Sequence, residues 1–161
     1  MKELVANASF KKGEYEEALV ETFLRIDELL NTSEGKAELT LLRDPAQFEY
    51  EVVEEGMVGC TANVALVVKD EFIVANVGDT RCLLSSKGKV IEMSEDHKPE
   101  LEREKKRIEE AGGEVISGRI NGNLNISRAL GDFPLKNNTA LRQEEQMLIA
   151  VPEIKKRKLT S

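Results

Sequence analysis

The sequence contains no tryptophan, one histidine and two cysteines among 161 residues, and aromatic residues make up only 4%. The core must therefore be built mainly from Val, Leu, Ile and Ala. Three soft side chains fall short of the four Cys or His ligands of a typical structural zinc site, so such a site is nearly excluded. Cys60 and Cys82 lie in apolar, strand-like surroundings, and we expect both to be small buried thiols.

Long apolar runs and an excess of basic residues are also missing. The uncharged stretch from Gly56 to Val68 is well short of the ~20 apolar residues that span a bilayer, and the first residues lack the hydrophobic segment of a signal peptide. A net charge of -7 argues against general nucleic-acid binding. We therefore expect no membrane, no nucleic acid and a cytoplasmic or nuclear location. The basic run at 155–158 is expected to be solvated.

Two common catalytic motifs are absent. Neither Gly35-Lys36 nor Gly88-Lys89 has the preceding glycine of a phosphate-binding P-loop. The chain also lacks the Gly-x-Ser-x-Gly turn that presents a serine nucleophile. Nucleotide binding through a P-loop and hydrolysis through such a serine are therefore unsupported.

The pattern of apolar residues predicts an α+β domain. Residues 13–30 have the three- and four-residue spacing of an amphipathic helix, whereas 31–55 has no clear period and reads as a loop or variable insertion. Short apolar runs then predict an antiparallel meander, and a second helix is expected from Pro99 to the glycines at 112–113. The four predicted strands of the meander are 61–68, 71–77, 81–85 and 89–93.

Two further segments follow the second helix. Residues 115–126 include Gly118 and Asn121-Gly122, a pair typical of hairpin turns, and we expect a short two-stranded excursion there. Residues 127–133 are expected to form a tight turn or a short helix.

Two groups of residues could carry chemistry. Asp79 follows a predicted strand at the Gly78-Asp79 corner, where its carboxylate could reach a hard cation or satisfy backbone donors of its own turn. Arg128 and Asp132 have helical spacing, so they could form an ion pair, or Arg128 could face a phosphorylated ligand. The residues alone favour the structural role in both cases.

Five motifs occur along the chain in a fixed order. They are Gly59-Cys60-Thr61-Ala62, Ala75-Asn76-Val77-Gly78-Asp79-Thr80-Arg81, Asp96-His97-Lys98-Pro99, Ala111-Gly112-Gly113 and Ser127-Arg128-Ala129-Leu130-Gly131-Asp132. In this order they resemble the motifs of the metal-dependent serine/threonine protein phosphatases of the 2C type. The resemblance covers nearly the whole chain, because the helix at 15–30 is also similar to a long helix of that family.

The resemblance implies a fold, a reaction and site residues. The fold is an antiparallel β-sandwich flanked by helices (α-β-β-α), and the reaction is hydrolysis of phosphoserine or phosphothreonine in proteins by a water that bridges two Mg or Mn ions. It implies that Asp79 is a metal ligand, with Thr61 and Gly78 in support. A flap is implied at about 115–125, anchored by Arg128 and Asp132, whereas His97 belongs to a structural motif.

The resemblance also implies that the chain is the central portion of one domain over residues 1–161. The family's acidic strand, Asp-Gly-His-Gly-Gly motif and later Asp-Gly and Asp-Asn ligands have no counterpart here. We therefore expect no catalytic residue, a weakly bound or absent metal and an inactive isolated chain. The alternative is a truncated pseudophosphatase that binds phosphoproteins or a partner. Uncovered sheet edges would favour self-association.

Overall fold

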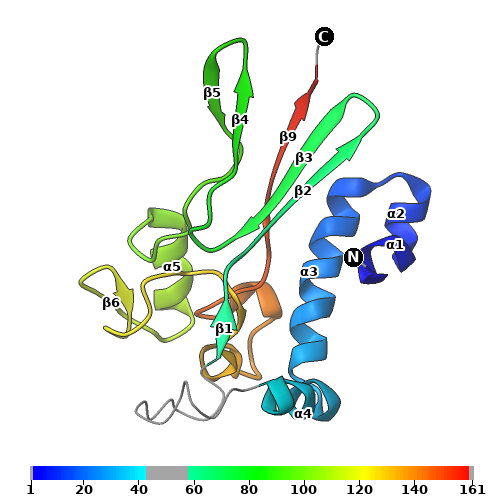
Figure 1. Cartoon of the computed structure of the whole chain (residues 1–161). Helices are drawn as coiled ribbons and strands as arrows, with labels where there is room; N and C mark the ends of the chain where they lie inside the picture. Colours follow the sequence, from blue (N-terminus) through cyan, green and yellow to red (C-terminus); the bar gives the residue numbers. More distant parts are fainter. Residues whose placement is uncertain (1, 43–57, 160–161) are drawn as a thin grey trace.

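A computed structural model describes residues 2–42 and 58–159 and confirms the α+β class (Figure 1). The helices are α1 (Lys2–Ala6), α2 (Ala8–Lys12), α3 (Tyr15–Leu30), α4 (Ser33–Leu42) and α5 (Glu102–Glu110), with 3₁₀ turns η1 (Phe133–Lys136) and η2 (Gln143–Glu145). The strands are β1 (Gly59–Cys60), β2 (Ala62–Val68), β3 (Glu71–Val77), β4 (Leu83–Ser86), β5 (Lys89–Glu92), β6 (Val115–Ile116), β7 (Arg119–Ile120), β8 (Leu130–Gly131) and β9 (Glu153–Lys158).

The central sheet has the strand order β2-β3-β9, and α3 runs along one of its faces (Figure 1). Alternate residues of β3 point to α3, because side chains on a strand alternate between the two faces of a sheet. Ile73 and Val77 thereby join Leu19 and Phe23 in one buried cluster. Each such buried side chain contributes about 1.5–3 kcal/mol of transfer free energy, so this contact fixes β3 and the corner that follows it.

The predicted four-strand meander is wrong in one pairing: its two hairpins, β2–β3 and β4–β5, form as expected, but β4 does not pair with β3. β2 and β3 pair as expected, from Ala62 with Val77 to Val68 with Glu71. The other edge of β3 is occupied by β9, while β4 and β5 form a separate two-stranded sheet. The physical reason is the turn after Val77, which takes the chain away from the sheet and leaves that edge free for the distant β9.

The region expected to be an irregular loop over 31–55 begins with the helix α4. Thr32 accepts a hydrogen bond from the backbone N–H of Gly35 and so caps the first turn. The helix has no buried residue, which explains why its sequence shows no amphipathic period. Residues 43–57 of the predicted loop and its continuation lie outside the described part of the chain.

The expected excursion after α5 is confirmed as the β6–β7 hairpin, but its turn is not at Asn121-Gly122. Ser117 and Gly118 make the hairpin turn with φ of 51° and 72°. Asn121 and Gly122 make a second left-handed turn directly after β7. Both dipeptides accept the positive φ that tight turns need, so turn chemistry alone does not distinguish them.

Several thiol and apolar side chains of the strands are exposed. Cys60 is exposed and Cys82 is only half-buried, which corrects the prediction of two buried thiols; β1 is a two-residue strand that pairs only with β8 among the described residues. Val67, Leu83 and Val90 are 58–69% exposed on β2, β4 and β5. Self-association through uncovered sheet edges stays a prediction.

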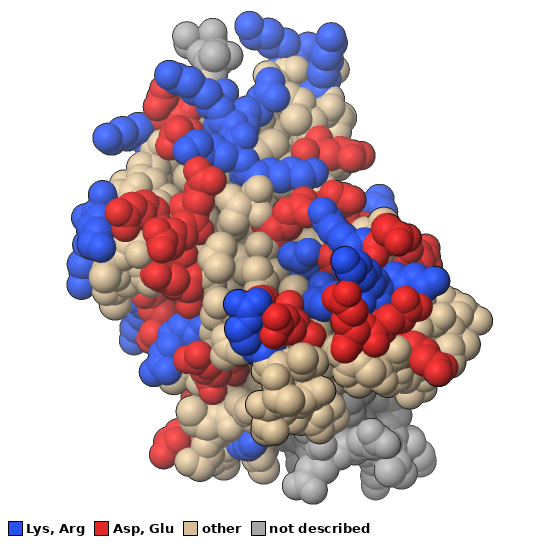
Figure 2. Space-filling view, turned by 180° about the vertical axis from the view of Figure 1, so that it is seen from behind, with Lys and Arg blue, Asp and Glu red and all other residues tan. Residues whose placement is uncertain are grey.

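The basic run lies on β9. Lys156 is paired with Glu16 and Glu71, and Lys158 with Asp70, at 2.7–3.3 Å. Seen from behind, basic side chains gather at the end of the molecule to which β9 leads (Figure 2). None of the helices within residues 2–42 and 58–159 is long and apolar enough to cross a membrane.

Candidate functional site

The structure brings Thr61, Gly78 and Asp79 together where β3 ends. Gly78 has a φ of 89°, and a Cβ atom at this position would lie 2.3 Å from Cγ2 of Thr61. Only glycine combines this left-handed backbone with so close an approach. The hydroxyls of Thr61 and Thr80 are 2.7 Å apart, which ties the start of β2 to the residue after Asp79. We call residues 78–80 the corner.

His97 holds the corner through its backbone and its side chain. Its backbone N–H donates to the Gly78 carbonyl, and its Nδ1 accepts from the Gly78 N–H, each at 3.1 Å. The Asn76 side-chain amide donates to the same Gly78 carbonyl and to the carbonyl of Glu95. The backbone that carries Asp79 is therefore fixed from two sides by buried polar groups.

The Asp79 carboxylate faces a neighbouring cation that belongs to the chain. The Lys98 ammonium donates to Oδ2 of Asp79 at 2.5 Å, and each side chain is 32% exposed. Beside this pair, Arg81 makes a two-bond contact with Asp96 at 2.8–2.9 Å. The hydrogen bonds from Arg81 lower the pKa of Asp96, so this carboxylate is also committed to a cation.

The described residues do not by themselves fit a two-metal centre. Two Mg or Mn ions require several oxygen ligands around each ion. Within residues 2–42 and 58–159, no group of three His, Cys, Asp or Glu side chains comes together in a way that could hold a metal. Asp79 offers one carboxylate, and that carboxylate already carries an ion pair.

Arg128 and Asp132 do not pair, which corrects the interpretation of their spacing. Residues 128–132 are not helical: Arg128 bridges to Ile149, and β8 follows. Arg128 instead donates to the Glu104 carboxylate and to the Val151 carbonyl. Asp132 has a φ of 51° and turns toward Gly59, where burial raises the pKa of its carboxyl group.

These motif residues allow a comparison with known proteins. The sequence profile of the family Protein phosphatase 2C matches residues 2–161. The chain belongs to the protein phosphatase 2C family. Protein phosphatase 2C 1 of Paramecium tetraurelia is 51% identical over 158 residues, which are 98% of this chain and 51% of that protein. Probable protein phosphatase 2C 21 of Arabidopsis thaliana is 36% identical and covers 94% of this chain and 51% of its own length.

Solved structures agree with this assignment. A phosphatase from a pathogenic strain of Toxoplasma gondii is 41% identical with a TM-score of 0.53, covering 55% of this chain and 28% of its own. A sex-determining protein of C. elegans is 30% identical with a TM-score of 0.57, covering 91% of this chain and 37% of its own. The chain thus spans about half the length of the curated 2C relatives that it matches.

Glu104 is the residue of this 2C chain that the sequence analysis missed. It is fully buried and accepts hydrogen bonds from Arg107, Arg128 and Ser127. Burial would raise its pKa, but hydrogen bonds from Arg128 and the charges of both arginines outweigh burial and hold the pKa at about 2. Glu104 lies one helical turn before Ile108, so both residues are on the buried face of α5. This spacing could have indicated from the sequence that Glu104 is buried.

The buried cluster formed by Glu104, Arg107, Arg128 and Ser127 is connected to the corner. Ser127 donates its hydroxyl to Glu104 and its backbone N–H to the carbonyl of His97 at 3.0 Å. The β6–β7 hairpin and the residues after it pack beside the cluster, with Ile120 and Ile126 against Ile108 of α5. The cluster therefore joins α5, the residues after this hairpin and the segment that holds Asp79. Anchoring of the flap by Arg128 and Asp132 stays a prediction.

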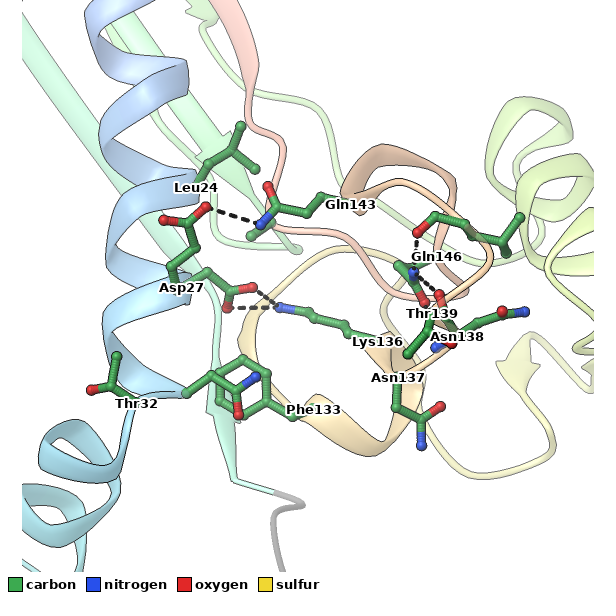
Figure 3. A pocket seen from close by; sticks show the side chains of 14 residues that line it. Leu24, Asp27, Thr32, Phe133, Lys136, Asn137, Asn138, Thr139, Gln143 and Gln146 are labelled. Atoms are coloured by element: carbon green, nitrogen blue, oxygen red, sulfur yellow. Dashed lines mark hydrogen bonds and ion pairs between the residues drawn. The ribbon is translucent and has the colours of Figure 1, made fainter.

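A separate cavity of about 570 Å³ lies between α3, η1 and residues 137–146 (Figure 3). Lys136 reaches across its wall to Asp27 with two hydrogen bonds of 2.8 Å and donates a third to the carbonyl of Ala129. The side-chain amide of Gln146 donates hydrogen bonds to the backbone carbonyls of Asn138 and Leu141, which hold the loop at this side of the cavity. The ammonium of Lys136 already has three acceptors, and Asp79 does not line this cavity. We therefore assign the candidate site to the corner.

We predict that His97 makes the stability of the chain depend on pH. Burial, followed by the nearby charge of Arg128, lowers its pKa from 6.5 to about 4. Because the unfolded state binds the proton more readily between these values, stability is complete above pH 6.5 and falls as the pH drops toward 4. The loss between pH 7.5 and pH 5 should be about 2 kcal/mol.

Urea unfolding at both pH values tests this prediction. The matched variant is His97→Asn, because its side-chain oxygen can still accept the hydrogen bond from Gly78 but does not titrate. We expect the pH-dependent loss of stability to be about 2 kcal/mol smaller in the variant than in the wild type. Equal losses in the two proteins would show that His97 is not the group responsible.

Proposed function

We propose that this chain is the part of a 2C phosphatase domain that carries the corner and the flap. The proposal is that the whole protein hydrolyses phosphoserine or phosphothreonine in proteins with Mg or Mn. The observation that carries it is the meeting of three motifs at one place: Thr61 packs on Gly78, and His97 binds the backbone next to Asp79. A fixed carboxylate at a strand end is suited to a hard cation.

In this proposal the chain supplies positioning rather than a complete reaction centre. When bound, the metal ions would activate a water for attack on the phosphoryl group. Asp79 offers a carboxylate on a backbone that does not need to reorganise, because Gly78 is held by His97 and Asn76. We assign no catalytic step to the described residues, since they do not bring together a two-metal ligand set.

A second candidate function is a non-catalytic module that binds phosphoproteins or a partner. The observation that favours it is the ion pair between Asp79 and Lys98, which commits the carboxylate to a cation of the chain itself. The two functions differ in whether the corner supports turnover when the remaining half of a 2C domain is supplied.

A chimera distinguishes the two functions. The 158-residue segment that matches in Paramecium protein phosphatase 2C 1 is replaced by this chain, and hydrolysis of a phosphothreonine peptide is measured in Mn. We expect the chimera to hydrolyse the peptide and the 161-residue chain alone to show no Mn-dependent turnover. A folded but inactive chimera would favour the binding module. Turnover by the chain alone would show that its ligand set is complete.

A further inference from the structure

The four basic residues of β9 point to opposite faces of the central sheet. Two of them, Lys156 and Lys158, lie on the face that packs against α3 and are paired with acidic side chains. Lys155 and Arg157 alternate with them and therefore lie on the other face. Within residues 2–42 and 58–159, no carboxylate forms an ion pair with either of these two. Half of the basic run is thus neutralised on the sheet, and the other half is available to a partner.

Two turns bring further lysines to the same end of the molecule. Lys69 is in the β2–β3 turn, and the end of β9 lies against this turn, because the N–H of Leu159 donates to the carbonyl of Asp70 at 2.6 Å. Lys87 and Lys89 are at the β4–β5 turn, which projects in the same direction (Figure 1). All three lysines are exposed, and in the part of the chain that the structure describes none of them has an acidic partner. Basic side chains consequently gather at this end (Figure 2).

Exposed apolar side chains lie among these cations. Val67 of β2 is opposite Phe72 of β3, which in turn is opposite Arg157 of β9, so the three residues form one row across the sheet. Val67 and Val90 are both largely exposed. We call the cations and this row the basic end, whose five cations are Lys69, Lys87, Lys89, Lys155 and Arg157. Such a surface fits a partner that offers carboxylates and apolar side chains together.

The charge and shape of the basic end favour a protein partner. The whole chain has a net charge of -7, so a local excess of cations attracts an acidic partner to this end and orients it. A membrane surface fits less well, because the tips of the two turns are Lys69-Asp70 and Lys87-Gly88, which have no apolar side chain to insert between lipids. The apolar row lies on the strands instead, where a segment of protein chain can cover it.

We propose that the basic end docks an extended acidic segment of a partner protein. Lys155 and Arg157 are two residues apart on one strand face, which separates them by about 7 Å and matches two carboxylates at alternate positions of an extended chain. The basic end lies where β3 begins, whereas the corner follows the end of β3, so a bound segment leaves Asp79 uncovered (Figure 1). The inference does not depend on the reaction proposed for the whole protein or on a metal at the corner.

Fluorescence anisotropy of a labelled peptide with glutamate at alternate positions tests this inference on the full 161-residue chain. At about 0.15 M salt, where charges are screened beyond roughly 8 Å, we expect the wild type to bind this peptide and not a peptide with lysine in place of glutamate. The double variant Lys155→Gln, Arg157→Gln should raise the Kd about tenfold, because two ion pairs are lost. The matched control Lys105→Gln, Lys106→Gln makes the same charge change on α5 and should leave the Kd unchanged.

Amide chemical shifts of the wild-type chain give a measurement that needs no variant. The acidic peptide should shift the signals of residues 67–72, 87–90 and 155–158 and leave those of residues 78–80 in place. Absence of binding, or equal weakening in the two double variants, would overturn the proposal. Tighter binding to vesicles of phosphatidylcholine and phosphatidylserine, or to duplex DNA, would also overturn it, because the basic end would then select lipid or nucleic-acid phosphates over an acidic protein segment.

Discussion

Replacing Glu104 with glutamine should lower the free energy of unfolding of the chain by about 3–5 kcal/mol, the range observed when one partner of a buried ion pair is removed. The carboxylate is fully buried between Arg107 and Arg128, whose side chains are 12–13% exposed. Glutamine keeps the shape and one hydrogen-bond acceptor for Ser127, but it leaves two guanidinium groups without their counter-charge. Urea unfolding at pH 7.5 measures the loss.

The matched control is Glu110→Gln on the same helix. Glu110 is exposed and lies 3.8 Å from Lys106, so this change should cost less than about 1 kcal/mol. NMR signals of Gly78 and His97 should shift in Glu104→Gln and stay in place in Glu110→Gln, because only Glu104 reaches the corner through Ser127. Equal losses of stability in both variants would contradict the importance of the buried cluster.

Local patterns predicted the elements that are held by local forces. The β3 strand was predicted over the observed range Glu71–Val77, because alternating apolar residues bury one face against α3. The start of the expected helix at Pro99 was less accurate: α5 begins at Glu102, because Leu101 keeps an extended backbone with ψ of 131°. Such boundaries depend on capping geometry, which composition alone does not determine.

Long-range contacts were the part that the sequence could not supply. The pairing of β9 with β3 joins residues about 80 positions apart. The basic run of β9 also lacks the alternation of apolar and polar residues that would indicate a strand. The corner itself was predicted at Asp79, but its ion pair with Lys98 was not. Arg128 was expected to pair with Asp132, four residues away, whereas its partner Glu104 comes from α5.

The largest effect on activity is expected from Asp79→Asn. Changes to the outer-shell partners of metal ligands already cost about 10–100-fold in affinity or activity, so loss of a ligand should reduce turnover by on the order of 100-fold. Asparagine keeps the size of the side chain and can still accept a hydrogen bond from Lys98. The variant therefore removes the negative charge while leaving the corner folded. The Thr61–Thr80 contact does not involve this side chain.

The central claim is that the corner belongs to the metal site of a 2C phosphatase. Its most direct test is the Mn dependence of phosphopeptide hydrolysis by the chimera carrying wild-type Asp79, Asp79→Asn or Asp70→Asn. Asp70 is an exposed carboxylate of the β2–β3 turn and pairs with Lys158 at 3.2 Å. We predict that Asp79→Asn loses activity on the order of 100-fold and that Asp70→Asn matches the wild type. Equal activity of all three proteins at every Mn concentration would contradict the claim.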